Sequence, residues 1–199
     1  MRYYHAAVSS GRLAQALGYM AKFIACLSFL ALSALAQDRV GLEDAVVLST
    51  VVQSMCTGLV AHGESGYLVL SDRSEEVGNK EGRKEFDRGT VASLINRNSV
   101  SHQLPSITLC PGVRVFKHDD IRAALEKFSA DDFNDDFISN FRQAFPGSFG
   151  PTGMSLPGYA DNGESALVVV SNAGGSFYYV LRKVEGRWSV EKTVFRSIA

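Results

Sequence analysis

The sequence HGESG at residues 62–66 combines three residue types that can catalyse hydrolysis. His62, Glu64 and Ser65 lie within four positions. A nucleophile elbow, however, has the pattern Gly-x-Ser-x-Gly on a turn from a strand into a helix, and Ser65 instead precedes a predicted strand. The similar sequence NGESA at residues 162–166 also leads into a predicted strand. We interpret both sequences as turns that begin strands, and we expect no catalytic residue here.

A second histidine lies beside two acids. His118 is followed by Asp119 and Asp120, and a neighbouring carboxylate can orient an imidazole and raise its pKa. Adjacent residues at a helix start point in different directions, however, and one aspartate can accept hydrogen bonds from the unpaired amides of the next turn. The pattern predicts that Asp119 or Asp120 caps a helix.

The acidic sequence DDFNDDF at residues 131–137 differs from a calcium-binding loop. An EF-hand loop has oxygen ligands at alternating positions and a glycine at the sixth, whereas here phenylalanines separate the acids. A solvated acidic helix face is the better interpretation, because the helix dipole stabilises acids near the N-terminus. The cysteines and histidines lie too far apart for a zinc site, and no nucleotide-binding fingerprint occurs. We expect no metal and no cofactor.

The strongest candidate for a binding surface is a loop rich in proline and glycine. From Pro146 to Gly158 seven of thirteen residues are Pro or Gly, so regular structure is not expected before Ala166. Apolar and aromatic side chains on a stiff loop suit a binding surface because they lose little entropy on contact. The candidates are Phe149, Met154, Leu156 and Tyr159. The alternative is that these side chains fold back onto the sheet.

Four segments have apolar residues at the spacing of amphipathic helices. Residues 42–60 form the longest such segment, and the others cover residues 86–95, 121–128 and 133–145. In the last segment phenylalanine recurs at every fourth position. This repeat is typical of a helix face that packs in the core.

Five β-rich runs predict strands; they are residues 67–71, 113–117, 166–170, 177–184 and 187–195. Glu185 and Gly186 join the last two and fit a two-residue hairpin loop. With that loop Tyr179 faces Lys192, and the hairpin has one apolar face and one more polar face, as in a half-covered sheet. The predicted fold class is α+β, with several helices packed on a mostly antiparallel sheet that ends in a C-terminal β-meander.

The N-terminal residues predict export. Fourteen uncharged residues follow Lys22 and end in Ala-Leu-Ala. Residues 1–36 therefore have the pattern of a secretory signal peptide that is cleaved after Ala36, and Met20 is an alternative start codon. A membrane-spanning helix needs about 20 apolar residues, so we expect no stable membrane anchor after cleavage. We predict a single domain at residues 37–199, periplasmic or secreted.

Net charge and cysteine content indicate which partners to exclude and which covalent cross-link to expect. Residues 1–36 contain three basic residues and no acid, so the formal net charge of -1 becomes -4 for the remainder of the chain. Nucleic acids and anionic membranes attract clustered Lys and Arg, and we expect neither as a partner. In an oxidising compartment Cys56 and Cys110 are expected to form a disulfide. The alternative is two buried free thiols.

Three sequences in the second half of the chain carry a resemblance: FPGSFG, GESALVVVS and YYVLRKVEGRWSVEK. Together they resemble a loosely defined group of exported bacterial proteins without an assigned function. In that group a Pro-Gly-Ser-rich link precedes an Ala-Leu-Val strand and a Tyr-x-Leu-x-Lys hairpin that ends in Gly-x-Trp-x-Val. The resemblance covers roughly residues 67–199, and its motifs are structural. Members often have cysteines around the turn at residues 172–175, where this chain has none.

These observations favour an exported, non-enzymatic protein that binds another envelope or secreted protein. An inhibitor, an immunity factor or an accessory subunit would fit this description. The alternative is a carrier of a small ligand held between the sheet and the phenylalanine-lined helix, and a hydrolase is the third hypothesis.

Overall fold

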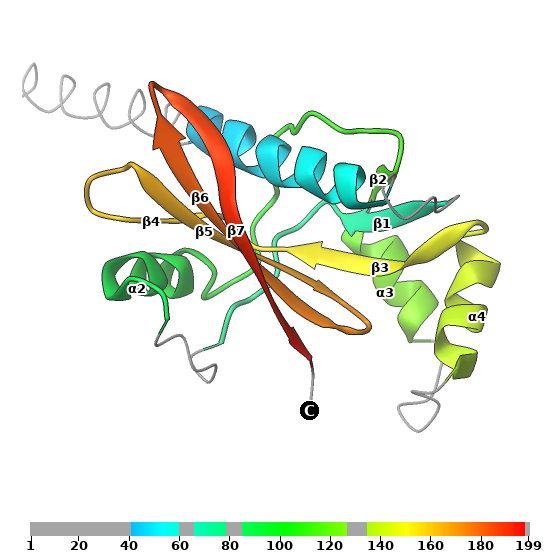
Figure 1. Cartoon of the computed structure of the whole chain (residues 1–199). Helices are drawn as coiled ribbons and strands as arrows, with labels where there is room; N and C mark the ends of the chain where they lie inside the picture. Colours follow the sequence, from blue (N-terminus) through cyan, green and yellow to red (C-terminus); the bar gives the residue numbers. More distant parts are fainter. Residues whose placement is uncertain (1–40, 60–65, 79–84, 127–134, 198–199) are drawn as a thin grey trace, which may run out of the picture. The chain divides into compact units, whose positions relative to one another are not determined.

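The computed structural model describes residues 41–59, 66–78, 85–126 and 135–197 (Figure 1). Several sequence predictions therefore lie outside the described residues; they concern the signal peptide at residues 1–36, His62, Glu64, Ser65, Asp131, Asp132 and Phe133.

Helices and strands alternate irregularly along the described residues. The helices are residues 41–59, α2 (Arg88–Arg97), α3 (His118–Leu125) and α4 (Asp135–Ala144). The strands are β1 (Tyr67–Ser71), β2 (Val113–Phe116), β3 (Ser148–Met154), β4 (Gly158–Tyr159), β5 (Ser165–Asn172), β6 (Gly175–Val184) and β7 (Arg187–Ser197). These elements confirm the α+β class and the C-terminal meander.

The strands form one mixed sheet in the order β2-β1-β3-β5-β6-β7, and β4 pairs with β5. β1 is parallel to both of its neighbours, since Leu68 pairs with Val113 of β2 and with Gly150 of β3. Every other pairing is antiparallel. The carboxyl ends of β1, β2 and β3 therefore meet at one edge of the sheet.

Helices cover both faces of the sheet (Figure 1). The helix at residues 41–59 buries Val47, Leu48 and Val51 completely, in one cluster with Leu70 and Val168 of the sheet. On the opposite face α3 and α4 pack over β1, whereas α2 packs over β5 and β6. Burial of these apolar side chains stabilises the sandwich by about 25 cal/mol for each Å² removed from water.

The two phenylalanines of the repeat whose side chains the structure describes, Phe141 and Phe145, lie in the core, as the spacing predicted. Phe141 is fully buried and stacks on Phe145, with ring centroids 4.7 Å apart. Phe145 in turn meets the edge of Phe116 from β2. The aromatic face of α4 therefore closes the core over the parallel strands.

The β6–β7 hairpin corrects the predicted register. Val184 pairs with Arg187 across the turn as expected, but the register shifts between Val180 and Leu181, so Tyr179 faces Thr193 instead of Lys192. A β-bulge of this kind places one additional residue in one strand. The prediction that only one face of this hairpin is covered was also wrong in part. Tyr178 lies on the face away from the helix at residues 41–59, and it is fully buried under α2.

The proline- and glycine-rich segment contains β3 and β4, so the prediction of no regular structure before Ala166 was wrong. β3 lies between β1 and β5; its residues 148–152 pair with β1 and its residues 152–154 pair with β5. Gly147 and Gly150 have φ values of 77° and 137°, which glycine adopts without a Cβ penalty. The register between β1 and β3 shifts beside Gly150, so the glycines allow a bulged strand here.

The N-terminus of α3 also differs from the prediction. The helix begins at His118, and Asp119 and Asp120 lie in its first turn. The capping carboxylate belongs to Asp72, just beyond β1, whose Oδ1 accepts the backbone N–H of His118 at 2.8 Å. The parallel pairing of β1 with β2 brings this distant side chain to the helix start, so the cap is not visible in the local sequence.

The two cysteines predicted to pair lie at disulfide distance. Cys56 belongs to the helix at residues 41–59, and Cys110 lies just before β2; their Cα atoms are 6.4 Å apart. The bond fastens the end of this helix to the edge of the sheet.

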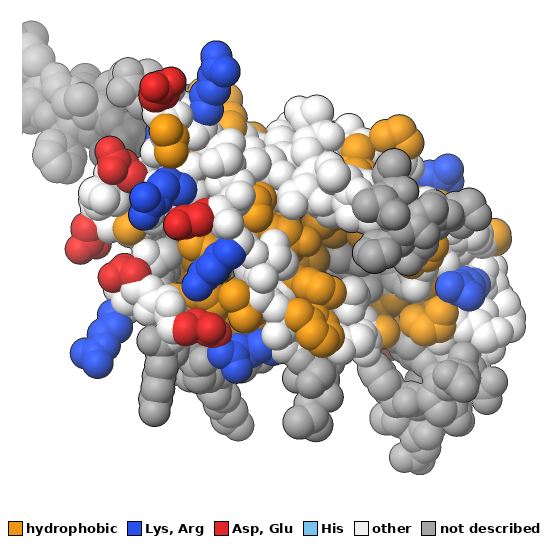
Figure 2. Space-filling model, in the orientation of Figure 1, with side chains coloured by type: hydrophobic (Ala, Val, Ile, Leu, Met, Phe, Trp, Pro, Cys, Tyr) orange, Lys and Arg blue, Asp and Glu red, His pale blue; other side chains and the backbone are white. Residues whose placement is uncertain are grey.

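β7 is the edge strand at the other end of the sheet. Its exposed side chains include Arg187, Glu191, Lys192 and Arg196, and charged side chains of both signs surround this part of the surface in Figure 2. Charges and a bulge on an edge strand disfavour pairing with another strand. β7 is therefore a poor docking edge.

Candidate functional site

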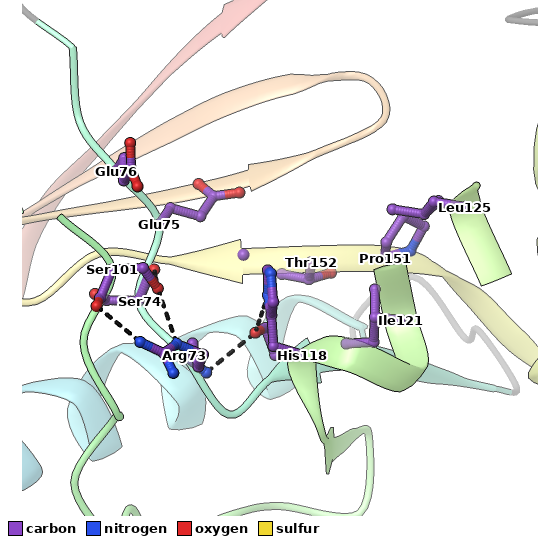
Figure 3. A pocket seen from close by; sticks show the side chains of 12 residues that line it. Arg73, Ser74, Glu75, Glu76, Ser101, His118, Ile121, Leu125, Pro151 and Thr152 are labelled. Carbon is purple, nitrogen blue, oxygen red and sulfur yellow. Dashed lines mark hydrogen bonds between the residues drawn. The ribbon is translucent and has the colours of Figure 1, made fainter. Parts of the chain in front are cut away.

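A groove opens where the two helical groups on the same face of the sheet do not meet. The cluster under α3 and α4 and the cluster under α2 share no residue. Between them lies an inner pocket of about 490 Å³ (Figure 3). Its walls come from the chain after β1, from α3 and from β3. The pocket is therefore built at the edge where the parallel strands end, which is where open α/β sheets usually bind ligands.

The parallel strands explain why residues distant in sequence meet here. Ser71 ends β1, and Arg73 follows it; Phe116 ends β2, and His118 follows it. Because both strands run in the same direction, the two polar segments that follow them lie side by side at the rim of the groove. Figure 3 shows Arg73 beside His118 at this rim.

Ser71 and His118 are in contact, but their geometry does not favour nucleophilic catalysis. Ser71 Oγ lies 3.3 Å from His118 Nδ1 and accepts the backbone N–H of Arg73 at 3.0 Å. Only 7% of Ser71 is exposed, so a substrate would not reach its hydroxyl. Among the described residues no carboxylate is hydrogen-bonded to the His118 ring, whereas a catalytic base is normally oriented by such a third group. The contact therefore positions His118 at the rim.

Arg73 is held by a neutral partner. Its Nε donates to Ser101 Oγ at 3.3 Å and its Nη2 to Ser101 O at 3.0 Å. A guanidinium has five N–H donors, so these bonds hold the group in place and leave donors facing the groove. Among the residues that the structure describes, Arg73 and Lys117 form no ion pair. Both side chains are exposed.

The inner pocket has an apolar wall and an acidic rim. Ile121 and Leu125 of α3 and Pro151 of β3 supply the apolar wall, and Glu75 lies on the other side (Figure 3). The Glu75 side chain crosses directly over Gly153, where a Cβ atom would collide with it. Gly153 is therefore required for the carboxylate to lie across the strand.

Two further pockets continue the groove. A middle pocket of about 430 Å³ shares Arg73, Ser101 and His118 with the inner pocket. An outer pocket of about 300 Å³ shares Asp72 and Gln103 with the middle pocket. The outer pocket is mostly apolar; its apolar lining is Leu104, Pro105, Ile107, Leu109 and Val115. The outer pocket is therefore mostly apolar, whereas charged residues line both the inner and the middle pocket.

The predicted binding residues are separated by the fold. Met154 is fully buried and Leu156 is 9% exposed, and both pack in the core under the helix at residues 41–59. Phe149 is partly buried in β3 and lies against Gly66. Tyr159 is partly buried in β4. For Met154 and Leu156 the structure has the alternative arrangement, in which the side chains fold back onto the sheet.

Tyr159 belongs to a buried polar network. Its hydroxyl donates to Asp44 Oδ1 at 2.8 Å, and Arg97 binds the same carboxylate and the Pro157 carbonyl. Burial, followed by the nearby Asp44 charge, raises the pKa of Tyr159 well above its ordinary value. The network joins elements of the core and leaves the Tyr159 hydroxyl no free surface for a partner.

Local sequence patterns do not reveal the residues that line the groove. Arg73 and Lys117 each follow an apolar strand, in the sequences LVLSDR and VRVFK. Polar residues that follow two strands indicate a shared site only when the strands are known to be parallel. Because a mostly antiparallel sheet was predicted, these residues were not expected to lie together. His118 was identified, but as part of a local helix start.

Among the described residues no group of three His, Cys, Asp or Glu side chains is arranged to hold a metal ion. In the same part of the chain no helix is both long and apolar enough to span a bilayer. No protein-family model, curated protein or solved structure matches this chain.

Proposed function

We propose that this protein is an exported, non-enzymatic binding protein whose groove holds an extended segment of another envelope protein. One observation carries the proposal: three pockets share lining residues in series, from α3 to the loop before β2. A compact small molecule would occupy one pocket, whereas an extended chain advances about 3.3 Å per residue and can occupy all three. An inhibitor, an immunity factor or an accessory subunit would use such a groove.

The shape and composition of the groove agree with peptide recognition. Extended peptides are generally bound through pockets for several of their side chains, and three neighbouring pockets, of which the outer one is mostly apolar, could provide such a series. Leu109 is 41% exposed and Val115 39% exposed at the outer end, so apolar area remains available for burial by a partner.

The test is a pull-down from the envelope of the producing cell, with the protein exported by its own leader and tagged at the C-terminus. The groove variant combines Lys117→Glu with Leu109→Ser. The matched control combines Arg187→Glu with Val184→Ser, which makes the same types of change at the tip of the β6–β7 hairpin, where Val184 is 55% exposed. Circular dichroism and thermal unfolding establish that both variants fold.

We expect one protein that is recovered by the wild type and the control and lost by the groove variant. Cross-linking that partner to the loop at residues 103–109 would locate the contact. Recovery of the same proteins by all three baits, or of none, would reject the proposal.

A carrier of a small ligand is the second candidate. The inner pocket alone, at about 490 Å³, lies within the range of about 300–1,000 Å³ that is usual for small-molecule sites. Native mass spectrometry of the protein from its own cell distinguishes the candidates, because a retained ligand adds mass. A bare polypeptide mass would count against the carrier.

A further inference from the structure

The two edges of the sheet differ in how open they are. β2 is the edge strand opposite β7, and among the described strands it pairs only with β1, from Val113 to Phe116 and without a register shift. Val115 is exposed. The Arg114 guanidinium lies over the Tyr67 ring of β1, 4.0 Å from its centre, and therefore on a face of the sheet. A regular edge strand that is not blocked in this way can accept a further strand.

Hydrogen bonds between β1 and β2 show which backbone groups of β2 face the open side. The Gly112 carbonyl accepts the Leu68 N–H at 2.9 Å. The Phe116 carbonyl accepts the Asp72 N–H, also at 2.9 Å. Both carbonyls therefore point toward β1. In a trans peptide the C=O and the N–H that follows it point in opposite directions, so the N–H after each of these carbonyls faces away from β1.

The open side of β2 presents backbone donors and acceptors that the protein does not use. Along a strand, successive residues direct their N–H and C=O to alternate sides. Both groups of Val115 therefore face away from β1, as do the Val113 C=O and the Lys117 N–H. No described residue bonds to any of these groups, whereas the Val113 N–H donates to the Cys110 carbonyl at 3.0 Å. An added strand of either direction could pair with this edge.

The outer pocket lies beside the open edge. It is lined by Val115 and by Leu109, Ile107 and Pro105 of the loop before β2. Val115 pairs with Leu70 of β1 and therefore lies on the face that the helix at residues 41–59 covers. In an added strand, the residue directly opposite Val115 has its side chain on that same face, at the outer pocket. Leu109 is 41% exposed there, so an apolar side chain would remove apolar surface from water.

We infer that an extended segment of the partner protein adds to the open edge of β2 as a further strand, with an apolar residue opposite Val115. The backbone groups on this edge specify the occupant, because an extended chain presents N–H and C=O groups at the spacing of a strand. Main-chain hydrogen bonds then provide affinity and the outer pocket selects the side chain, as in other cases of β-strand addition. This inference rests on the proposed function and specifies how one end of the bound segment is held.

The probe is the blocked peptide acetyl-Thr-Thr-Leu-Thr-Thr-amide, in which β-branched residues favour the extended form and Leu is the single apolar residue. Two further peptides carry one N-methyl group each, on Leu or on the Thr that follows it. An N-methyl group removes one N–H donor, as proline does, and leaves the side chains unchanged. Each peptide is titrated into the ¹⁵N-labelled protein, exported by its own leader, and the amide resonances are followed by NMR.

For the unmethylated peptide we expect saturable shifts at Val115 and Lys117, with slower hydrogen exchange of their amides in the complex. One N-methylated peptide should bind at least about tenfold more weakly, because the lost hydrogen bond leaves a carbonyl unpaired. The other should bind like the unmethylated peptide, since its N-methyl group points away from β2. Weaker binding with N-methyl-Leu indicates an antiparallel strand, and weaker binding with the N-methyl-Thr indicates a parallel strand.

A pair of variants tests the edge from the side of the protein. Val115→Pro removes an N–H that no ladder bond uses, and proline is tolerated at such edge positions. Val115→Thr is the matched control, because it retains the N–H and the β-branched shape. We expect the unmethylated peptide to bind the Thr variant and not the Pro variant, after circular dichroism and thermal unfolding establish that both fold. The comparison of the three peptides on the wild-type protein does not depend on either variant.

If the two N-methylated peptides bind equally well, the inference is overturned, because a paired strand uses only one of the two donors. Absence of saturable shifts at Val115 and Lys117 would overturn it as well. In both cases the proposed function is still tested by its own pull-down with the groove variant. Strand addition by the peptide together with a negative pull-down would reject the envelope partner while the docking edge stands.

Discussion

The Arg97 guanidinium donates two hydrogen bonds to the Asp44 carboxylate, at 2.6 and 3.0 Å, although 53 positions separate the two residues. Asp44 lies on the helix at residues 41–59 and is 4% exposed; Arg97 ends α2. These helices cover opposite faces of the sheet. The ion pair therefore joins the two layers at the end where β4 pairs with β5, and Tyr159 of β4 completes it.

Removal of one partner of this pair should be costly. Asp44→Asn retains the shape but leaves the Arg97 charge without its carboxylate in a mostly buried site. We expect the free energy of unfolding to fall by about 3 kcal/mol, at the lower end of the range for broken buried pairs because Arg97 is partly exposed. Urea denaturation measures the change.

Arg122→Gln is the control for that measurement. Arg122 forms exposed ion pairs with Asp119 and Glu126 on α3, and exposed pairs are worth about 0–1 kcal/mol. Equal losses for Asp44→Asn and Arg122→Gln would contradict the structural role assigned to the Asp44–Arg97 pair.

Glu43 should make stability depend on pH in the acidic range. Its carboxylate accepts hydrogen bonds from Lys183 Nζ and Trp188 Nε1. The Lys183 hydrogen bond, the largest cause, lowers the pKa of Glu43 below 4.5, with the Trp188 hydrogen bond adding to this effect. The unfolded chain therefore binds this proton at a higher pH than the folded chain, so the stabilisation is complete above about pH 4.5 and is lost as pH falls through the lower pKa.

The measurement is the free energy of unfolding from about pH 6 to about pH 3. Glu43→Gln should reduce the slope below about pH 4.5, and Trp188→Phe, which removes one donor, should give an intermediate slope. The Thr90 backbone N–H lowers the pKa of Asp87. Asp87 therefore makes stability depend on pH in the same direction in the wild type and in both variants. Identical slopes for the wild type and Glu43→Gln would reject the prediction.

Reduction of the cysteine pair should destabilise the folded protein. The chain between Cys56 and Cys110 spans 54 positions, for which the loop-entropy model gives about 4 kcal/mol as an upper figure. Chemical denaturation with and without dithiothreitol measures the effect. The double variant Cys56→Ser, Cys110→Ser should not respond to the reductant, and an equally insensitive wild type would contradict the prediction.

Local patterns predicted most of the elements of this fold. The phenylalanine repeat identified the buried face of α4, and the two-residue loop identified the β6–β7 turn. The patterns failed where a contact depends on a distant strand. β3 was missed because its glycines and Pro151 normally indicate a loop, whereas pairing with β1 along its first part and with β5 along its last part stabilises it as a strand.

The same limit applies to the candidate site. Met154 and Leu156 were predicted as surface anchors because the segment that contains them was predicted to be a loop. Met154 instead ends β3, Leu156 lies between β3 and β4, and both pack in the core. Arg73 and Lys117 line the same pocket because β1 and β2 are parallel. Parallel pairing is specified by crossover connections and not by any local sequence, so a single sequence without structural information does not reveal the groove.

β1 precedes both of its partners in the chain, and this order has a consequence during synthesis. β5, β6 and β7 pair with sequence neighbours through short turns, and such local pairing closes small loops at low entropic cost. Tyr67 to Ser71, by contrast, emerges first and has no complete set of partners until Met154 has emerged. A nascent chain interrupted before β3 therefore presents an apolar strand with one open side, and it is in this interval that the protein most needs a holding chaperone.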